Sequence, residues 1–315
     1  MVVGLGIYSP YAAVVDYPGD GPQRFQLDEA VIATVNVTPT IAWRPHRAWS
    51  IGAGVSYVVG FAELSRIQDF AELSDLGAAL ERLDQNNDFG PQAPTGVREL
   101  DVMARPIALT GMWAHAATFH AGVAFAPLAG LRFGLTYQHG ADLRFAGDFE
   151  LDMDDDFFTQ DLASQGLAYP KRVRGDAELR FSLPKVIRFA ARWQGAQAAL
   201  GVDIAYSFWS VVESFDVEVR SPDLAQPGVG LPPRTEIRLE RNWQDTLGVD
   251  ILGELRLTSS VLAYLRAGFR TSAVPDATID AASPDGDRIV GVGGIRFRVR
   301  EDMFVLADLG MQKIL

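Results

Sequence analysis

The most constraining feature of this sequence is a strict alternation of side chains along residues 49–61. A strand with such a pattern presents one apolar face and one small or polar face, because neighbouring side chains of a β-strand point to opposite sides. The apolar positions are Trp49, Ile51, Ala53, Val55, Tyr57, Val59 and Phe61. The pattern predicts a strand with an apolar medium on one side.

The same alternation recurs along the chain and predicts eleven strands. The expected strands are 2–9, 31–43, 49–61, 114–126, 131–151, 173–193, 198–208, 236–257, 261–270, 289–299 and 303–311. Pro184 lies in the middle of one of them and predicts a bulge or a break there, because proline cannot donate to the ladder.

The connections between these strands alternate between short and long. Short turns are expected near residues 45, 128, 195, 259 and 301. Long connections are expected over 10–28, 64–112, 152–171, 214–235 and 272–287. This alternation is typical of a transmembrane antiparallel β-barrel, whereas a soluble β-sandwich seldom maintains it. We therefore expect an all-β fold, a single barrel domain over residues 1–315.

Composition excludes some alternatives. The net charge of −12 argues against a nucleic-acid partner, and no apolar run reaches the roughly 18 residues of a membrane helix. The chain has no cysteine and no visible export signal at Met1. An odd strand number leaves a barrel unclosed. We therefore expect either a fragment or a barrel completed by other strands.

Five short motifs resemble one family. In chain order they are Phe181-Ser182-Leu183-Pro184, Tyr206-Ser207-Phe208-Trp209-Ser210, Asn242-Trp243-Gln244-Asp245-Thr246, Ala273-Val274-Pro275-Asp276 and Pro284-Asp285-Gly286-Asp287-Arg288. Together with Arg266-Ala267-Gly268, this series resembles the FadL-type outer-membrane transporters of long-chain fatty acids and their toluene- and xylene-channel relatives.

The resemblance implies a fold. Members form a fourteen-stranded barrel plugged by an N-terminal hatch, and the eleven expected strands resemble the third to the thirteenth. The hatch, the first strands and the last strand are then expected to be absent from this chain, and the complete barrel is expected to be a monomer. The expected location is the Gram-negative outer membrane, in contact with membrane lipid and lipopolysaccharide.

The resemblance also implies a function, which is passive uptake of long-chain fatty acids or similar hydrophobic molecules without a cofactor. An aromatic-hydrocarbon channel of the same family is the first alternative. A surface adhesin or phage receptor anchored by the barrel is another. A lipid hydrolase is the third, although the sequence has no nucleophile elbow, phosphate loop or H-E-x-x-H motif, and we expect no enzyme.

Two long loops are the first candidate ligand site. Residues 67–83 are expected to form an amphipathic helix, and a second loop carries several large apolar residues. By resemblance, the two loops form an external groove that collects the ligand. The groove residues are Phe70, Leu73, Leu76, Leu80, Leu83, Phe157, Phe158 and Leu162. In the alternative interpretation, these apolar residues only seal the loops against the barrel rim.

The barrel lumen is the second candidate site, with Phe61, Arg188, Arg192 and Trp209 as its expected ligand-binding residues. Strand alternation predicts inward guanidinium groups that can hold a carboxylate. The inward set is Arg132, Arg144, Arg172, Arg174, Arg180, Arg188, Arg192, Arg266 and Arg270. Alternatively, these arginines form ion pairs within the barrel. The expected acidic partners are Asp176, Glu178, Asp203, Asp250 and Glu254.

Phe61 and Glu63 lie where fatty acid transporters can place a basic anchor, so an uncharged ligand remains an option. The acidic loop Asp152–Asp156 lacks the glycine and distal glutamate of a calcium loop, and the four histidines lack metal-ligand spacing. We expect no metal site.

Overall fold

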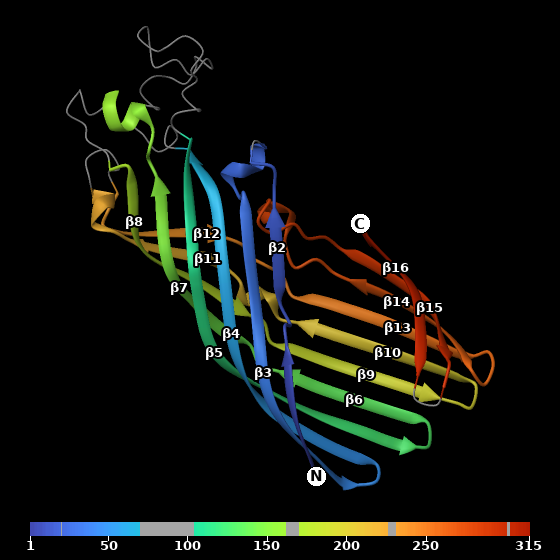
Figure 1. The fold of residues 1–315 in the computed structure, drawn as a ribbon. Helices are drawn as coiled ribbons and strands as arrows, with labels where there is room; N and C mark the ends of the chain where they lie inside the picture. Colours follow the sequence, from blue (N-terminus) through green and yellow to red (C-terminus); the bar gives the residue numbers. More distant parts are fainter. Residues whose placement is uncertain (20, 70–103, 162–169, 226–230, 301–302) are drawn as a thin grey trace.

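The computed structural model describes residues 1–19, 21–69, 104–161, 170–225, 231–300 and 303–315. These residues form one 16-stranded antiparallel sheet that curves around an interior (Figure 1). The first eight strands are β1 (Val2–Tyr8), β2 (Ala12–Asp16), β3 (Glu29–His46), β4 (Trp49–Asp69), β5 (Ala104–Leu128), β6 (Leu131–Gln138), β7 (Ala141–Asp152) and β8 (Arg172–Leu183). The others are β9 (Val186–Gln194), β10 (Ala198–Ser207), β11 (Ser214–Arg220), β12 (Arg234–Glu240), β13 (Thr246–Arg256), β14 (Val261–Arg270), β15 (Arg288–Arg298) and β16 (Phe304–Ile314).

Helical structure among the described residues is confined to single turns. These are η1 (Pro22–Phe25), η2 (Phe157–Asp161), η3 (Trp209–Val211), η4 (Pro222–Ala225) and η5 (Asp276–Thr278). In the described part of the chain, no helix is long and apolar enough to span a membrane.

The five expected short turns are confirmed. They join β3 to β4, β5 to β6, β9 to β10, β13 to β14 and β15 to β16. Figure 1 shows these hairpins along one edge of the sheet, with the long connections toward the opposite edge. The all-β antiparallel architecture is therefore as predicted.

The expected count of eleven strands is replaced by 16. Three expected strands are each divided in two, into β6 and β7, β8 and β9, and β12 and β13. The expected break at Pro184 is confirmed, since β8 ends at Leu183 and β9 begins at Val186. Two further strands, β2 and β11, form inside segments expected to be loops.

The divisions lie side by side in the sheet. On one side of the breaks the paired strands follow the order β6-β9-β10-β13. On the other side they follow the order β7-β8-β11-β12. Four neighbouring passes of the chain are thus interrupted at one level. We call β7, β8, β11 and β12 the upper sheet, and β6, β9, β10 and β13–β16 the lower sheet.

The inner and outer faces exchange polarity at this level. In the lower sheet, apolar residues such as Leu200 and Ile251 face outward, each 58% exposed, and arginines and carboxylates face inward. In the upper sheet, apolar residues face inward and are buried, and charged residues face outward. In three of the four broken passes the reason is local, because an odd shift at a break moves every later side chain to the other face. From β10 to β11 odd-numbered residues such as Ala205 and Val217 face inward on both sides of the break, so there the sequence itself changes polarity.

The core lies on the inner face of the upper sheet and the adjoining parts of β4 and β5. Phe145, Phe149 and Leu143 of β7 are each at most 2% exposed. They pack against small residues of the neighbouring strands, and a Cβ on Gly60 would lie only 2.7 Å from the ring of Phe145. Large residues on one strand therefore fill the space that small residues leave on the next.

The strand ends differ from the sequence expectation beside the long loops. β4 continues to Asp69 and pairs with β5 through Ala104, so residues 67–69 are strand and not the start of an amphipathic helix. The rest of that expected helix lies outside the described residues. Within the described sheet, β1, β2, β12 and β16 each have a neighbour on one side only.

Candidate functional site

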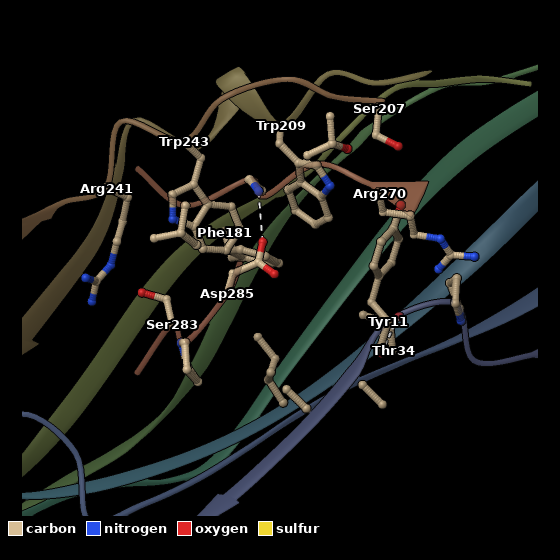
Figure 2. Close-up of a pocket in the computed structure, with 18 of the residues that line it drawn as sticks. Tyr11, Thr34, Phe181, Ser207, Trp209, Arg241, Trp243, Arg270, Ser283 and Asp285 are labelled. Carbon is tan, nitrogen blue, oxygen red and sulfur yellow. Dashed lines mark hydrogen bonds between the residues drawn. The ribbon is translucent and has the colours of Figure 1, made fainter. Parts of the chain in front are cut away.

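The curved sheet encloses a cavity of about 1380 Å³. Its wall combines β2 and β3, the upper strands β8, β11 and β12, the lower strands β9, β10 and β13, and the loop that follows β14. Figure 2 shows this cavity with aromatic, hydroxyl and arginine side chains pointing into it. The size and the apolar part of the wall suit a hydrophobic ligand.

Five aromatic residues of the cavity wall contact one another in a series that we call the aromatic cluster. Tyr11 packs edge-on against Trp209 at 5.7 Å between ring centroids, and Trp209 lies 5.3 Å from Trp243. Phe215 lies 5.7 Å from Trp243 and 5.6 Å from Phe181. Such edge-to-face contacts are favourable, so the cluster is a preformed apolar surface.

The breaks between strands place the two tryptophans. Trp209 belongs to the single turn η3 between β10 and β11, and Trp243 lies between β12 and β13. Asn242 has a φ of 47°, a left-handed conformation that asparagine tolerates, and it turns the chain just before Trp243. The backbone N–H of Trp243 then donates to Val212 O at 3.0 Å. Each tryptophan thus faces the interior because its strand is interrupted.

The lower part of the cavity wall is polar and ion-paired. Arg192 lies 2.8 Å from Glu254, and Arg188 lies 3.6 Å from Asp203. Arg266 and Arg270 both contact Asp250, at 3.0 and 3.5 Å. A hydrophobic ligand binds this wall less favourably than the apolar wall above it, because covering the polar groups of the wall without hydrogen bonds costs free energy.

The loop after β14 folds back into the cavity. Ala273 and Val274 at its tip are 7% and 5% exposed. The carboxylate of Asp287 accepts the backbone N–H of Ser272 at 2.7 Å, and that of Asp285 accepts the N–H of Ala273 at 2.8 Å (Figure 2). These two aspartates belong to the motif 284–288, so the motif holds the loop inside.

The same loop bridges to the N-terminal segment. The hydroxyl of Tyr17 donates to Ala281 O at 3.1 Å, and the N–H of Ala281 donates to the side chain of Gln26 at 3.2 Å. Arg241, whose side chain is 7% exposed, pairs with Asp280 at 2.6 Å. Residues far apart in the sequence therefore meet at the upper rim of the cavity.

Three of the four lumen residues expected from the sequence line this cavity. Arg188, Arg192 and Trp209 do so from neighbouring elements. Phe61 does not, because it lies on the outer face of β4, with its ring 5.1 Å from that of Trp113, which is 52% exposed. Its expected position in the lumen is wrong, since Phe61 continues the outward alternation that begins at Trp49.

The prediction that nine arginines point into the barrel is only partly correct. Arg188, Arg192, Arg266 and Arg270 line the cavity. Others lie on the outer face of the upper sheet, because the breaks at residues 139–140 and 184–185 reverse the alternation. The misplaced residues are Arg144, Arg172, Arg174 and Arg180. Of the expected ion pairs within the barrel, those of Asp203, Asp250 and Glu254 are present in the described structure. Glu178 instead pairs with Arg180 on the outer face.

Most of the expected loop groove cannot be compared with the structure. Phe70, Leu73, Leu76, Leu80, Leu83 and Leu162 lie outside the described residues, as does the side chain of Phe157. Phe158 is 1% exposed and belongs to the hydrophobic core, with Arg105 5.9 Å from its ring centroid. At Phe158 the structure therefore shows a seal against the barrel.

The acidic loop 152–156 is held by basic residues. Lys171 pairs with Asp154 at 2.8 Å, and Arg105 lies 3.5 Å from Asp155. The hydrogen bond from Lys171 lowers the pKa of the Asp154 carboxyl. In the described part of the chain, no cluster of histidines and carboxylates has the geometry of a metal site.

Sequence reasoning missed four members of the aromatic cluster as site residues, namely Tyr11, Phe181, Phe215 and Trp243. Two of them lie in motifs singled out above, Phe181 before Pro184 and Trp243 after Asn242. Large aromatic residues next to a strand break were the available signal. Their convergence depends on the pairing of β8, β11 and β12, which is a tertiary property.

Comparison with known proteins agrees with this architecture. The family model described as outer membrane protein transport protein (OMPP1/FadL/TodX) matches residues 1–314. The chain belongs to this family. No curated protein sequence matches it.

Solved structures share the fold of this FadL/TodX-family chain. A Pseudomonas aeruginosa FadL homologue has a TM-score of 0.73 at 17% identity, covering 98% of this chain and 66% of its own. The P. putida toluene transporter TodX has a TM-score of 0.64 at 12% identity, and the match covers 98% of this chain and 71% of TodX. The Ralstonia pickettii toluene transporter TbuX has a TM-score of 0.59 at 16% identity, and the match covers 99% of this chain and 77% of TbuX. The chain thus spans about two thirds to three quarters of these proteins.

Proposed function

We propose that this chain forms most of the wall of an outer-membrane channel for passive uptake of long-chain fatty acids or similar hydrophobic molecules. The observation that carries the proposal is the cavity of about 1380 Å³, with its aromatic cluster and apolar upper wall. Burial of apolar surface supplies the driving force, about 0.8 kcal/mol for each methylene group. No nucleotide or metal is needed for such a step.

The proposed path of the ligand follows from the height at which the cavity wall changes from apolar to charged. A ligand enters from the side of the long loops and reaches the aromatic cluster, below which the ion-paired wall of Arg192–Glu254 and Arg266–Asp250 begins. At the same height β1 and β2 are separated by Ser9-Pro10-Tyr11, and Pro10 and Tyr11 line the cavity. We infer that ligand leaves sideways through this interruption and not downward past the charged wall.

A second candidate ligand is an aromatic hydrocarbon. The observation that favours it is the aromatic cluster, since edge-to-face contacts are available to a ring in the cavity. TodX and TbuX, which share the fold, are named as toluene transporters. A receptor or adhesin without transport predicts no dependence on the cavity for either ligand.

The test uses a matched pair of substitutions. Ala205 lines the cavity, whereas Ala267 faces outward from β14 opposite Ile251. A205W places a large side chain in the cavity wall and is expected to reduce strongly the uptake of labelled oleate by cells that lack their own fatty acid transporter. A267W, the same change on the lipid side, is expected to leave uptake at the level of the unmodified chain.

The outcomes separate the candidates. Heat-modifiable migration on a gel shows that both variants are inserted. Uptake of toluene but not oleate, lost in A205W alone, selects the hydrocarbon channel. Equal uptake in A205W and A267W contradicts transport through this cavity.

A further inference from the structure

Trp209 is the ring of the aromatic cluster that connects its two sides. It lies 5.7 Å from Tyr11, in the interruption between β1 and β2, and 5.3 Å from Trp243 on the opposite side (Figure 2). Both contacts are edge-on, with 82° and 69° between the ring planes. Because edge-to-face contacts depend on ring orientation, the shape of the cluster depends on how the side chain of Trp209 is held.

The backbone of Trp209 is not part of a strand, so the sheet does not fix it. Trp209 begins the single turn η3, and the residue before this turn, Phe208, makes no side-chain hydrogen bond to cap it. The first N–H groups of a helical turn have no partner within the turn. The beginning of η3 therefore depends on an acceptor from another segment of the chain.

The carboxylate of Asp245, between β12 and β13, is that acceptor. Its Oδ1 accepts the backbone N–H of Ser210 at 3.0 Å, and its Oδ2 accepts the hydroxyl of Tyr206 at 2.9 Å. The hydrogen bond from the Ser210 side chain is the largest cause that lowers the pKa of the Asp245 carboxyl, so the group is ionised at neutral pH. Hydrogen bonds to an ionised acceptor are stronger than neutral ones. One side chain thus joins the end of β10, the turn of Trp209 and the segment that carries Trp243.

The residues on either side of η3 are held independently of Asp245. The N–H of Phe208 donates to Lys185 O at 2.9 Å, and the N–H of Trp243 donates to Val212 O at 3.0 Å. These backbone hydrogen bonds keep the strand breaks in place before and after the turn. Loss of the carboxylate is therefore expected to release η3 without unfolding the wall of the cavity.

We propose that Asp245 is a positioning residue for ligand binding. By fixing η3, it keeps the ring of Trp209 edge-on between Tyr11 and Trp243, and this arrangement presents the aromatic cluster to the ligand. The carboxylate acts through these rings, since Asp245 is not among the described residues that line the cavity. The inference rests on the proposed function, because it requires that the hydrophobic molecule binds in this cavity.

The test compares variants of the chain purified from outer membranes in mild detergent. D245A removes both acceptor oxygens, D245N keeps one of them, and Y206F removes one hydrogen bond but leaves that of Ser210. The matched control is D216A, which removes a carboxylate of β11 that accepts the hydroxyl of Ser214 at 2.8 Å. Heat-modifiable migration on a gel shows which variants are folded.

Two readouts distinguish positioning from a merely structural role. The first is the fluorine NMR resonance of Trp209 in protein labelled with fluorotryptophan, assigned through W209F. The second is the dissociation constant of labelled oleate or toluene, whichever the unmodified chain binds. We expect D245A to shift the Trp209 resonance and to weaken ligand binding about tenfold, equivalent to about 1.4 kcal/mol. D245N and Y206F are expected to lie between D245A and the unmodified chain, and D216A to match the unmodified chain.

A double-mutant cycle connects the effect to the ring. In a W209A background, D245A is expected to cause no further loss of affinity, because the side chain through which Asp245 acts is then absent. Additive losses would show that Asp245 acts elsewhere and would overturn the proposal.

An unchanged Trp209 resonance in D245A also overturns the proposal, and so does a shifted resonance with unchanged ligand affinity. If D245A is not heat-modifiable, Y206F decides by the same two readouts. Failure of the unmodified chain to bind either oleate or toluene contradicts the proposed function instead, and the Trp209 resonance then still decides whether Asp245 holds the ring.

Discussion

The upper and lower sheets are made from the same chain passes but have opposite polarity. The lower sheet has an apolar outside and an ion-paired inside, as in a strand that faces lipid and lumen. The upper sheet has a charged outside and an inside built around Phe145 and Phe149, as in a soluble β-protein. The comparison shows that one barrel wall is adapted to two surroundings, an apolar one below the breaks and a polar one above them. Interruptions in four neighbouring passes lie where the polarity changes, and in three of them the break itself reverses which residues face inward.

The difference also explains the position of the cavity. The aromatic cluster lies at the breaks, and the wall below them mixes apolar residues such as Ala205 and Leu252 with charged ones. Below, Asp250 and Glu254 pair with arginines from neighbouring strands. A ligand site of mixed character therefore forms where the two sheets join.

The largest expected effect tests whether the inside of the upper sheet is a true core. F145A removes a fully buried ring above Gly60 and is expected to lower the free energy of unfolding by about 3–5 kcal/mol. F133A removes an outward ring of the lower sheet, whose partners are Phe125 and Phe189, and is expected to cost about 0.5–1.5 kcal/mol. Denaturant unfolding in detergent measures both. Equal losses would contradict the distinction between the two sheets.

A new charge on each outer face is expected to have unequal effects. I251K places a lysine on the lipid side of β13 and is expected to cost about 2–4 kcal/mol. A146K places it on the outside of β7 opposite Glu178 and is expected to change stability by less than about 0.5 kcal/mol. Unfolding in lipid vesicles gives both values. A large cost at Ala146 would mean that the upper sheet faces hydrocarbon.

The strand break itself is accessible through Gly140. A Cβ at this position would lie 2.5 Å from the backbone oxygen of Leu183, so G140A forces β7 and β8 apart at the break. The expected loss is about 1–3 kcal/mol. G134A, in β6 of the same pass, meets no atom within 4 Å and is the control. A neutral G140A would show that the break tolerates rearrangement.

The smallest expected effect concerns the exposed ion pair of Lys171 and Asp154 above the upper sheet. The pKa of Asp154 is lowered chiefly by the hydrogen bond from Lys171, so its contribution to stability is present above the ordinary carboxyl pKa and is lost as pH falls through the lowered value. K171Q is expected to raise the pKa of Asp154 toward its ordinary value, observed by NMR titration. K185Q, at the break, is the control. An unchanged titration in K171Q would show that Lys171 does not hold this carboxyl.

Much of the fold could be predicted because the relevant signals are local. Alternation along 49–61, the five short turns and the break at Pro184 all depend on residues adjacent in sequence. Arg188, Arg192 and Trp209 were likewise placed in the lumen by alternation and motif. Arg144, Arg172, Arg174 and Arg180 were expected on the wrong face, because one residue inserted at a break is enough to change the face. The error at Phe61 is of another kind, since the unbroken alternation from Trp49 already places Phe61 on the outer face.

The sequence by itself determined the antiparallel strands, the hairpins and the family to which the chain belongs, because these follow from a two-residue period, from turn chemistry and from motif order. Only the tertiary structure decided which face is inside in each half of a broken strand. It also decided that Tyr11, Phe181, Phe215 and Trp243 meet at one cavity and that Arg144 faces Arg180. The physical reason is that register between strands is a property of pairs, and no single strand contains it.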